Sequence, residues 1–250
     1  MAATALLHAQ SPLPPNGGIT ELIAAGDELI TKAFDNERAL QKYLEALSVD
    51  PSNPDVLWRI SRAYVDIGEH LPTRTDQEKA SQLAAYEKAL EFAERAVSAA
   101  PMNSMAYTRR AIANGRIALF RGVWESLELV KQVKADLEKA IELDSQNDVA
   151  YYVLGRTHAK VSERPRVFRW PLGLSWANLD EAIQHYERAI AIKSDFIMYR
   201  LDCARAYVEK EEFDNARRHL TLIASLPTLD EDDERFRREA KELLGQLKGK

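Results

Sequence analysis

The stretch Ala182-Ile-Gln-His-Tyr-Glu-Arg-Ala-Ile190 decides the fold class of this chain. Its apolar and small residues recur at steps of three and four residues with charged residues opposite, a pattern typical of an amphipathic α-helix. Three further stretches share this design, with small alanines at sites of close helix contact and a larger residue between them: 39–51, 89–101 and 137–144. Pro51 and Pro101 close two of these stretches, at positions where proline ends a helix.

A second kind of helix follows each of these endings. Each carries one small residue where two helices must cross closely, and these residues are Ser61, Ala111, Gly155 and Ala204. The two kinds of helix form a pair that recurs about every 34 residues, the period of a tetratricopeptide repeat (TPR). We therefore predict an all-α, TPR-type α-solenoid, a right-handed superhelix of about five helix pairs. A charged helix from Glu231 to Leu247 is predicted to cap its C-terminal end.

Local signals refine this plan. Capping boxes are predicted at Thr75–Glu78 and Thr228–Glu231, where a threonine and a glutamate three positions later can satisfy free backbone N–H groups. The repeat is interrupted by predicted insertions at 70–82, 120–132 and 163–178.

Composition bounds the class of protein. The chain has 250 residues, 46% hydrophobic and 29% charged, which is typical of a soluble globular protein. A formal net charge of −5 gives no reason to expect nucleic acid as a partner. Cys203 is the only cysteine, which excludes an intramolecular disulfide. No apolar run reaches the length of about 18 residues typical of a membrane span, so no transmembrane segment is expected.

We divide the chain into an N-terminal tail, residues 1–18, and a solenoid domain, residues 19–250. The tail is either a disordered segment or the remnant of a secretory signal peptide, because Ala2–Ala9 is small and apolar but lacks a basic start. A signal remnant would place the protein in the periplasm or outside the cell, and a plain tail would place it in the cytoplasm.

In the later half, several stretches follow one another in a characteristic order: Ala140–Asp144, Tyr151–Arg156, Val161–Ser162, an aromatic insert before Asp180–Ile183, and Leu226–Thr228 before an acidic helix start. This order resembles the tetratricopeptide domain of the regulator of microtubule dynamics family. The resemblance covers the chain from Glu78 to Leu244.

The resemblance implies a non-enzymatic helical domain. Some eukaryotic members of the family act at microtubules or at contacts between endoplasmic reticulum and mitochondria, and one such domain is associated with phospholipid binding. Those members often carry a membrane anchor and extra segments, which this sequence lacks. We therefore expect a bacterial type of relative, for which microtubules are not the partner.

Candidate binding residues follow from helical spacing, because the first helix of each TPR pair lines the concave face. Aligned first helices place one set at a groove-facing position: Trp58, Thr108, Tyr152 and Leu201. One turn later comes a second set, with two cations further along: Arg62, Ile112, Arg156 and Arg205, then Arg116 and Lys160. Guanidinium groups bind carboxylates and phosphates, so the groove is predicted to hold an acidic peptide, a carboxy-terminus or a phospholipid head group. The alternative is that these arginines pair with Asp and Glu of neighbouring helices.

The insert Arg164–Trp176 supplies a second set of candidates, namely Arg166, Phe168, Arg169, Trp170 and Trp176. Long loops in compact domains are often functional, and Arg and Trp are frequent at interfaces. The aromatic residues are expected either to fold back as a plug in the solenoid or to form a lid that gates the groove.

Motifs for catalysis are missing from the sequence, which contains no phosphate loop, no dinucleotide-binding glycine pattern and no HExxH. No histidine is spaced from another for local zinc binding, so no metal or cofactor is predicted. His158 and Cys203 are expected to be packed core residues. The sequence thus predicts a non-enzymatic scaffold that binds a protein or peptide partner in its concave groove. The alternative function is the binding or transfer of a lipid or other anionic amphiphile in the same cavity.

Overall fold

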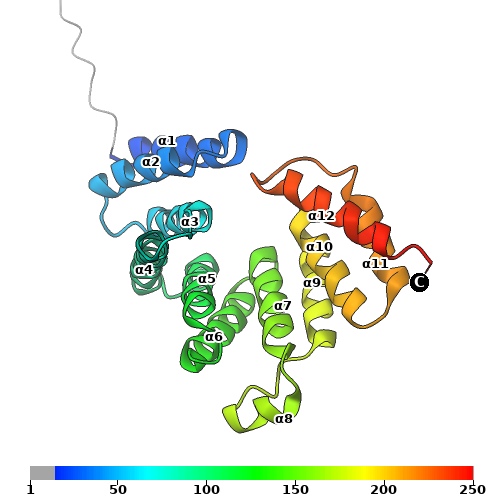
Figure 1. Cartoon of the computed structure of the whole chain (residues 1–250). Coiled ribbons are helices and arrows are strands. Elements are labelled where there is room, and N and C mark those ends of the chain that lie inside the picture. Colours follow the sequence, from blue (N-terminus) through cyan, green and yellow to red (C-terminus); the bar gives the residue numbers. More distant parts are fainter. Residues whose placement is uncertain (1–14, 250) are drawn as a thin grey trace, which may run out of the picture.

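The computed structural model describes residues 15–249, which form helices that pack in consecutive pairs (Figure 1). The α-helices are α1 (Pro15–Glu28), α2 (Asn36–Val49), α3 (Pro54–His70), α4 (Asp76–Ala99), α5 (Ser104–Arg121), α6 (Leu127–Leu143), α7 (Asp148–Ser162), α8 (Arg166–Arg169), α9 (Leu179–Ile192), α10 (Ile197–Glu209), α11 (Phe213–Ile223) and α12 (Asp233–Gln246). A π-helical turn, η1 (Leu29–Ala33), continues α1, and a 3-10 turn, η2 (Trp170–Leu172), follows α8. The predicted all-α, TPR-type solenoid is confirmed.

Within residues 15–249 there is no strand, and no helix has both the length and the apolar character needed to span a bilayer. The predicted tail falls mainly on residues 1–14, which lie outside the described part of the chain. Helix α1 begins at Pro15, slightly before the predicted start of the solenoid domain.

Five helix pairs follow one another in the described chain: α1/α2, α3/α4, α5/α6, α7/α9 and α10/α11. The small residues predicted at the crossings are buried, and Gly155 shows why they are small. A Cβ atom at Gly155 would lie 2.8 Å from Cδ1 of Tyr186 and 3.0 Å from the carbonyl oxygen of Ala182, so any larger residue would push the two helices apart. Phe236 and Ala240 of α12 pack into the core formed by α10 and α11, which confirms the predicted capping helix.

Side-chain caps explain where several helices begin. The amide oxygens of Asn53, Asn103 and Asn147 accept hydrogen bonds from the first backbone N–H groups of α3, α5 and α7. The predicted capping box at Thr75–Glu78 is present at the start of α4.

The second predicted capping box, Thr228–Glu231, is wrong. Helix α12 begins at Asp233, whose buried carboxylate accepts hydrogen bonds from the backbone N–H groups of Leu229 (2.7 Å) and Asp230 (2.9 Å). The acidic residues therefore form a turn before the helix, and the Thr228 hydroxyl accepts from Arg237 instead.

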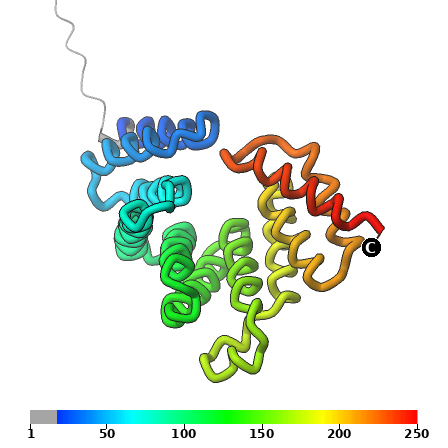
Figure 2. The backbone as a smooth tube through the Cα atoms, viewed as in Figure 1, coloured from blue at the N-terminus to red at the C-terminus, as the bar shows by residue number. Residues whose placement is uncertain are grey.

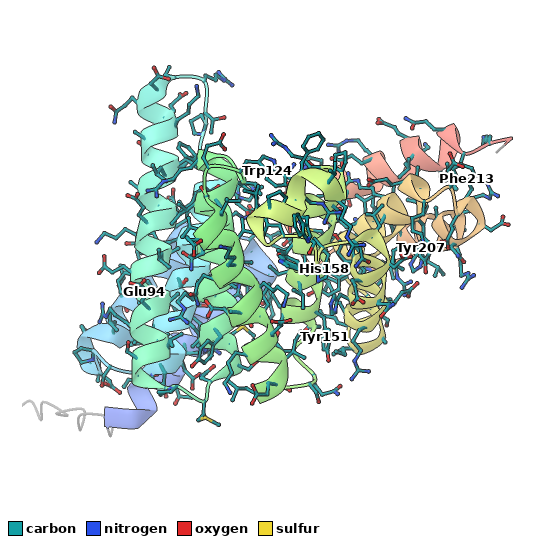
Figure 3. The ribbon with its side chains drawn as sticks, turned by 90° about the horizontal axis from the view of Figure 1, so that it is seen from below. Glu94, Trp124, Tyr151, His158, Tyr207 and Phe213 are labelled. Carbon is teal, nitrogen blue, oxygen red and sulfur yellow. The ribbon has the colours of Figure 1, made fainter. Side chains whose placement is uncertain are left out.

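The insertions take three forms. The one at 70–82 forms a short loop and the first turns of α4, whose 24 residues extend it past the neighbouring helices (Figure 3). The one at 120–132 forms the end of α5, a loop and the start of α6. The one at 163–178 holds α8 and η2, splits the fourth pair and protrudes from the body of the molecule (Figure 1).

The solenoid curves until its two ends approach each other (Figure 2). Asn36, the first residue of α2, donates from Nδ2 to Oε1 of Glu231 at 2.8 Å. His70 at the end of α3 lies 3.3 Å from the same carboxylate and 3.8 Å from that of Asp232. We call these four residues the end clasp, because they join the first two helix pairs to the loop before α12.

Candidate functional site: a central cavity

The concave side of the solenoid encloses a cavity of about 860 Å³. Its walls come mainly from the first helices of the pairs, α3, α5, α7 and α10, and the N-terminal part of α12 completes them. The end clasp contributes all four of its residues to the lining. Curvature therefore turns the open groove expected of a TPR solenoid into a more enclosed site.

All the candidate groove residues line this cavity: Trp58, Arg62, Arg116, Tyr152, Arg156, Lys160 and Arg205. Ile112 lines it as well. Thr108 and Leu201 do not, and their predicted groove position is wrong. Both are buried between helices, and the Thr108 hydroxyl accepts a hydrogen bond from Nδ2 of Asn147 at 2.9 Å.

Asp202 of α10 contacts three of the candidate groove residues. Its carboxylate accepts a hydrogen bond from the Tyr152 hydroxyl at 2.7 Å and pairs with Arg205 at 2.7 Å and Arg156 at 3.6 Å. The Tyr152 ring stacks on Tyr199 with centroids 4.5 Å apart. Asp202 and Tyr199 thereby hold the Tyr152 ring in place, and Asp202 draws Arg156 and Arg205 to one side of the cavity.

The other predicted cations also have acidic partners. Arg116 forms an ion pair with Glu69 of α3, and Lys160 pairs with Glu163 at 2.8 Å. Arg62 lies 3.3 Å from Asp66, one turn further along α3. Arg116, Arg156 and Arg205 thus pair with acidic residues of neighbouring helices, as the alternative predicted, whereas Arg62 and Lys160 pair with residues close to them in the sequence.

Arg109 is the exception, and the sequence-based prediction missed it. It lines the cavity from α5, is only 9% exposed, and makes no hydrogen bond or ion pair within residues 15–249. Burial, reinforced by the positive charge of Arg62, lowers the pKa of Arg109 to about 10, so the guanidinium stays charged at neutral pH. Its one close aromatic contact is Trp58, whose ring centre lies 5.7 Å from the guanidinium carbon. The carboxylates of Asp66 and Asp148 attract this charge without forming an ion pair or hydrogen bond with it. A buried guanidinium without a hydrogen-bonded partner costs stability, so its free N–H groups could donate to a ligand carboxylate.

A sequence signal for Arg109 existed. It precedes Arg116 by seven residues, nearly two full helical turns, so the two side chains lie on one face of α5. Alignment on the crossing residues alone assigned the neighbouring Thr108 to that face.

The insert does not line the central cavity, so the expected lid over the groove is wrong. Phe168 and Trp170 are exposed, which contradicts the expected plug for these two residues. Trp176 is half-buried and packs edge-on against His158, with ring centroids 4.9 Å apart. Arg169 is buried and Arg166 is exposed.

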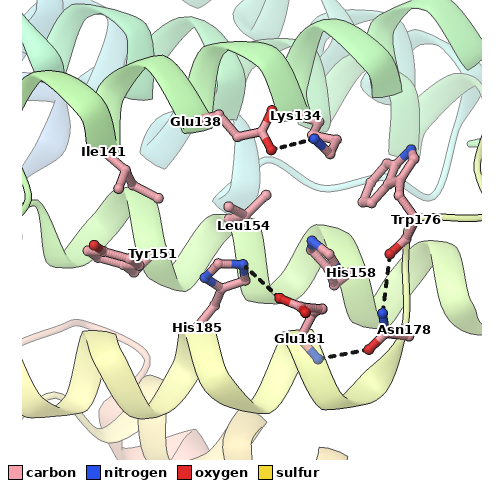
Figure 4. Close-up of a pocket in the computed structure, with 10 residues that line it drawn as sticks. All are labelled: Lys134, Glu138, Ile141, Tyr151, Leu154, His158, Trp176, Asn178, Glu181 and His185. Carbon is pink, nitrogen blue, oxygen red and sulfur yellow. Dashed lines mark hydrogen bonds and ion pairs between the residues drawn. The ribbon is translucent and has the colours of Figure 1, made fainter.

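A second, smaller pocket lies under the base of the insert between α6, α7 and α9 (Figure 4). His158 and His185 face each other in it with ring centroids 5.3 Å apart, and Lys134 pairs with Glu138 at its rim. Burial, and then the positive charge of His185, lower the pKa of His158 to about 4. His158 is buried, as expected for a core residue.

Cys203 is buried as expected, but three helices bring it to polar neighbours. Its Sγ lies 3.8 Å from Nε2 of His219, which in turn lies 3.0 Å from Oε1 of Glu187. The Tyr207 hydroxyl donates to the same Glu187 oxygen at 3.0 Å. Burial raises the pKa of the Cys203 thiol, so this sulfur is protonated and a poor nucleophile.

These features define a tetratricopeptide-type solenoid whose first helices and capping helix surround a central cavity. A thermophilic TPR protein of Thermus thermophilus has a similar structure, with a TM-score of 0.66 and 18% identity over 90% of this chain and 99% of that one. PilF of Pseudomonas aeruginosa is similar with a TM-score of 0.57 and 13% identity, over 93% and 90% of the two chains. At these identities the likeness concerns the fold alone.

The family is shown by sequence. The model of the family described as regulator of microtubule dynamics protein 1-3 matches residues 22–248, and the chain belongs to this family. Regulator of microtubule dynamics protein 2 of Mus musculus is 27% identical over 200 residues, which are 78% of this chain and 48% of that protein. Protein 3 of Rattus norvegicus is 26% identical over 232 residues, 89% of this chain and 48% of that one. The chain thus spans about half the length of these curated relatives.

Proposed function

We propose that the chain is a non-enzymatic binding module that holds an acidic segment of a partner protein in its central cavity. Arg109 is the observation that carries this proposal. Its guanidinium is buried, charged and unpaired at the cavity wall, and a carboxylate of the partner would supply the charge-assisted hydrogen bonds that it lacks. Trp58 beside it offers a flat apolar surface to the neighbouring part of the ligand.

The polarity of the cavity supports a peptide rather than a lipid. An extended peptide brings backbone N–H and C=O groups that need partners, and charged side chains from α3, α7, α10 and α12 line the cavity. A lipid carrier would need a continuous apolar lining. A cavity of about 860 Å³ accommodates a short segment, not a folded domain.

One corner of the cavity favours the alternative of an anionic amphiphile. At the ends of α5, α6 and α7 the lining is apolar, with Arg116 and Lys160 nearby; its members are Ala118, Leu119, Val123, Val130, Val133 and Val161. An acyl chain would occupy this corner, and its head group would lie against the two cations. Lipid extraction and native mass spectrometry of protein from its own cells test this alternative, since a co-purified amphiphile would establish it.

The peptide proposal is tested by fluorescence anisotropy of the full chain with a labelled acidic peptide and its Asn/Gln counterpart. We expect the acidic peptide alone to bind, and Arg109→Met to weaken it about 10- to 100-fold, the value of a charge-assisted hydrogen bond. Arg121→Met is the matched control, because Arg121 lies on the same helix but outside the cavity, paired with Glu87. Equal affinities of wild type and Arg109→Met would contradict the proposal.

A further inference from the structure

The insert between α7 and α9 exposes an unusual group of apolar side chains. Val167 is 70% exposed, Phe168 62% and Trp170 72%, all within four consecutive positions. The other large apolar side chains exposed among the described residues do not fall within four consecutive positions: Leu44, Val49, Met102, Leu119 and Leu222. Single exposed apolar residues are ordinary, whereas a contiguous patch marks a contact surface.

A buried arginine holds the insert in this shape. Arg169 is only 6% exposed, and its guanidinium donates to the carbonyl oxygens of Arg164 at 2.7 Å, Leu174 at 3.1 Å and Ala177 at 2.5 Å. Leu174 and Ala177 are buried in a core cluster with Val161. The backbone is therefore wrapped around one side chain, which makes the exposed face part of a fixed structure.

The geometry of α8 explains why the apolar side chains point outward. Arg169 faces inward from this single helical turn, so its neighbours Phe168 and Trp170 lie on other sides and remain exposed. The Arg169 side chain occupies the inside of the loop with its three carbonyl hydrogen bonds, while the two aromatic rings stay outside it. The exposure is thus built into the fold.

The charge of the insert is positive, although the chain as a whole carries −5. The segment 164–177 contains three arginines and no acidic residue. The Arg164 guanidinium lies 4.3 Å from the ring centre of Trp124, beside the insert (Figure 3), and Arg166 forms no ion pair within residues 15–249. We call Arg164, Arg166, Val167, Phe168 and Trp170 the insert tip.

We propose that the insert tip docks on an anionic lipid bilayer. Its apolar side chains lie on a protruding, convex segment (Figure 1), which suits insertion among lipid head groups, whereas a protein partner would need a matching pocket. Tryptophan and phenylalanine partition into the interface between water and lipid, and exposed arginines are attracted by anionic head groups. This surface is separate from the central cavity, so the proposal goes beyond the peptide-binding function.

The test is flotation of the full chain with vesicles of phosphatidylcholine alone or mixed with phosphatidylglycerol. Wild type is expected to float only with the mixed vesicles. Phe168→Ala combined with Trp170→Ala should weaken binding about a hundredfold or more through lost apolar burial. Arg166→Gln should weaken it about fivefold through lost charge.

Two control variants make the outcome specific. Met102→Ala combined with Leu222→Ala removes exposed apolar side chains elsewhere and should leave flotation unchanged. Arg109→Met should also leave it unchanged, so a failed peptide test does not decide the membrane test. Because the altered tip residues are exposed, all tip variants should unfold at the wild-type temperature. The proposal would be overturned if the wild type did not float with anionic vesicles, or if the double tip variant floated like the wild type. It would also be overturned if the insert tip bound only a protein.

Discussion

Arg109 and Arg110 are neighbours on α5, yet their replacement by methionine should change stability in opposite directions. Leaving a buried polar group such as the Arg109 guanidinium unpaired costs about 1 to 3 kcal/mol. Its contact with Trp58, whose ring centre lies 5.7 Å away, offsets about 0.5 to 1 kcal/mol of this cost. Methionine keeps the apolar stem and removes the charge. We therefore expect Arg109→Met to raise the free energy of unfolding by about 1 to 2 kcal/mol.

The pH dependence of this gain follows from the pKa of Arg109, which burial and the charge of Arg62 lower from its ordinary value to about 10. The unfolded chain binds this proton more tightly than the folded chain does. The charged side chain therefore destabilises the fold at every pH below about 10, and the penalty shrinks only as the pH rises above that value. The gain from Arg109→Met should accordingly be constant between about pH 6 and pH 9.

Arg110 provides the opposite case. Its Nε and Nη2 atoms donate to the carboxylate of Asp136 at 2.8 and 2.7 Å, and the Asp136 side chain is only 3% exposed. Arg110→Met would leave this buried carboxylate with the amide of Gln132 as its remaining partner. Removing one member of a buried pair costs about 3 to 5 kcal/mol, so this variant should be strongly destabilised.

Urea unfolding followed by circular dichroism, with melting temperatures by calorimetry, measures both changes. For a chain of this size, each kcal/mol moves the melting temperature by about 2 to 4 °C. Because both residues lie on one helix, they report on the same unfolding unit. If Arg109→Met destabilises the protein as Arg110→Met does, Arg109 already has an internal partner, and the argument for an anion site at this position fails.

Three further predictions test the packing, the buried histidine and the end clasp. Gly155→Ala should lower the free energy of unfolding by about 1 to 3 kcal/mol, because the new methyl group meets a tyrosine ring and a carbonyl of α9. The control Gly245→Ala, whose methyl group has nothing within 4 Å, should be neutral or stabilising in the same urea titration. His158 has a pKa lowered to about 4, so the unfolded chain takes up its proton first and stability should fall as the pH drops from about 6.5 toward 4. His158→Phe should reduce that loss in melts at a series of pH values, and an unchanged pH profile would contradict the prediction. Glu231→Ala should open the end clasp and increase the radius of gyration in small-angle scattering, whereas Glu234→Ala should not. The loss of stability of Glu231→Ala should stay below about 1 kcal/mol, because the end-clasp contacts are near the surface.

The parts of the fold that depend on local spacing were predictable from sequence. Small residues such as Gly155 mark helix crossings because only small side chains fit there, and this requirement is written into each repeat. Arg62, Arg156 and Arg205 each follow a crossing residue by one position and line the cavity, and their role in binding stays a prediction.

Positions at the edge of a helical face were not predictable in the same way. Thr108 and Arg109 both lie near the boundary between the groove and the neighbouring helix. Adjacent residues of a helix point about 100° apart, so a small error in the assigned face decides which of the two is expected in the cavity. The prediction for the insert was wrong because it depended on tertiary packing. The aromatic residues of the insert were expected to form either a plug or a lid over the groove, but Arg169 occupies the interior of the insert with three carbonyl hydrogen bonds that sequence spacing does not reveal.

The charge distribution of the cavity indicates how a ligand would lie in it. Its lining on α3, α5 and α7, with the residue after α7, has five Lys or Arg and four Asp or Glu. The remaining lining, from Lys193 through α10 to α12, has three Lys or Arg and six Asp or Glu. The two sides therefore differ in net charge, +1 against −3, and Arg109 is on the positive side. A segment with its acidic residues toward Arg109 and its basic residues toward α12 would match this gradient, whereas the reversed segment would place like charges together. Peptides of identical composition and opposite charge order should therefore differ in affinity, and equal binding of both would show that the cavity holds only a single anion at Arg109.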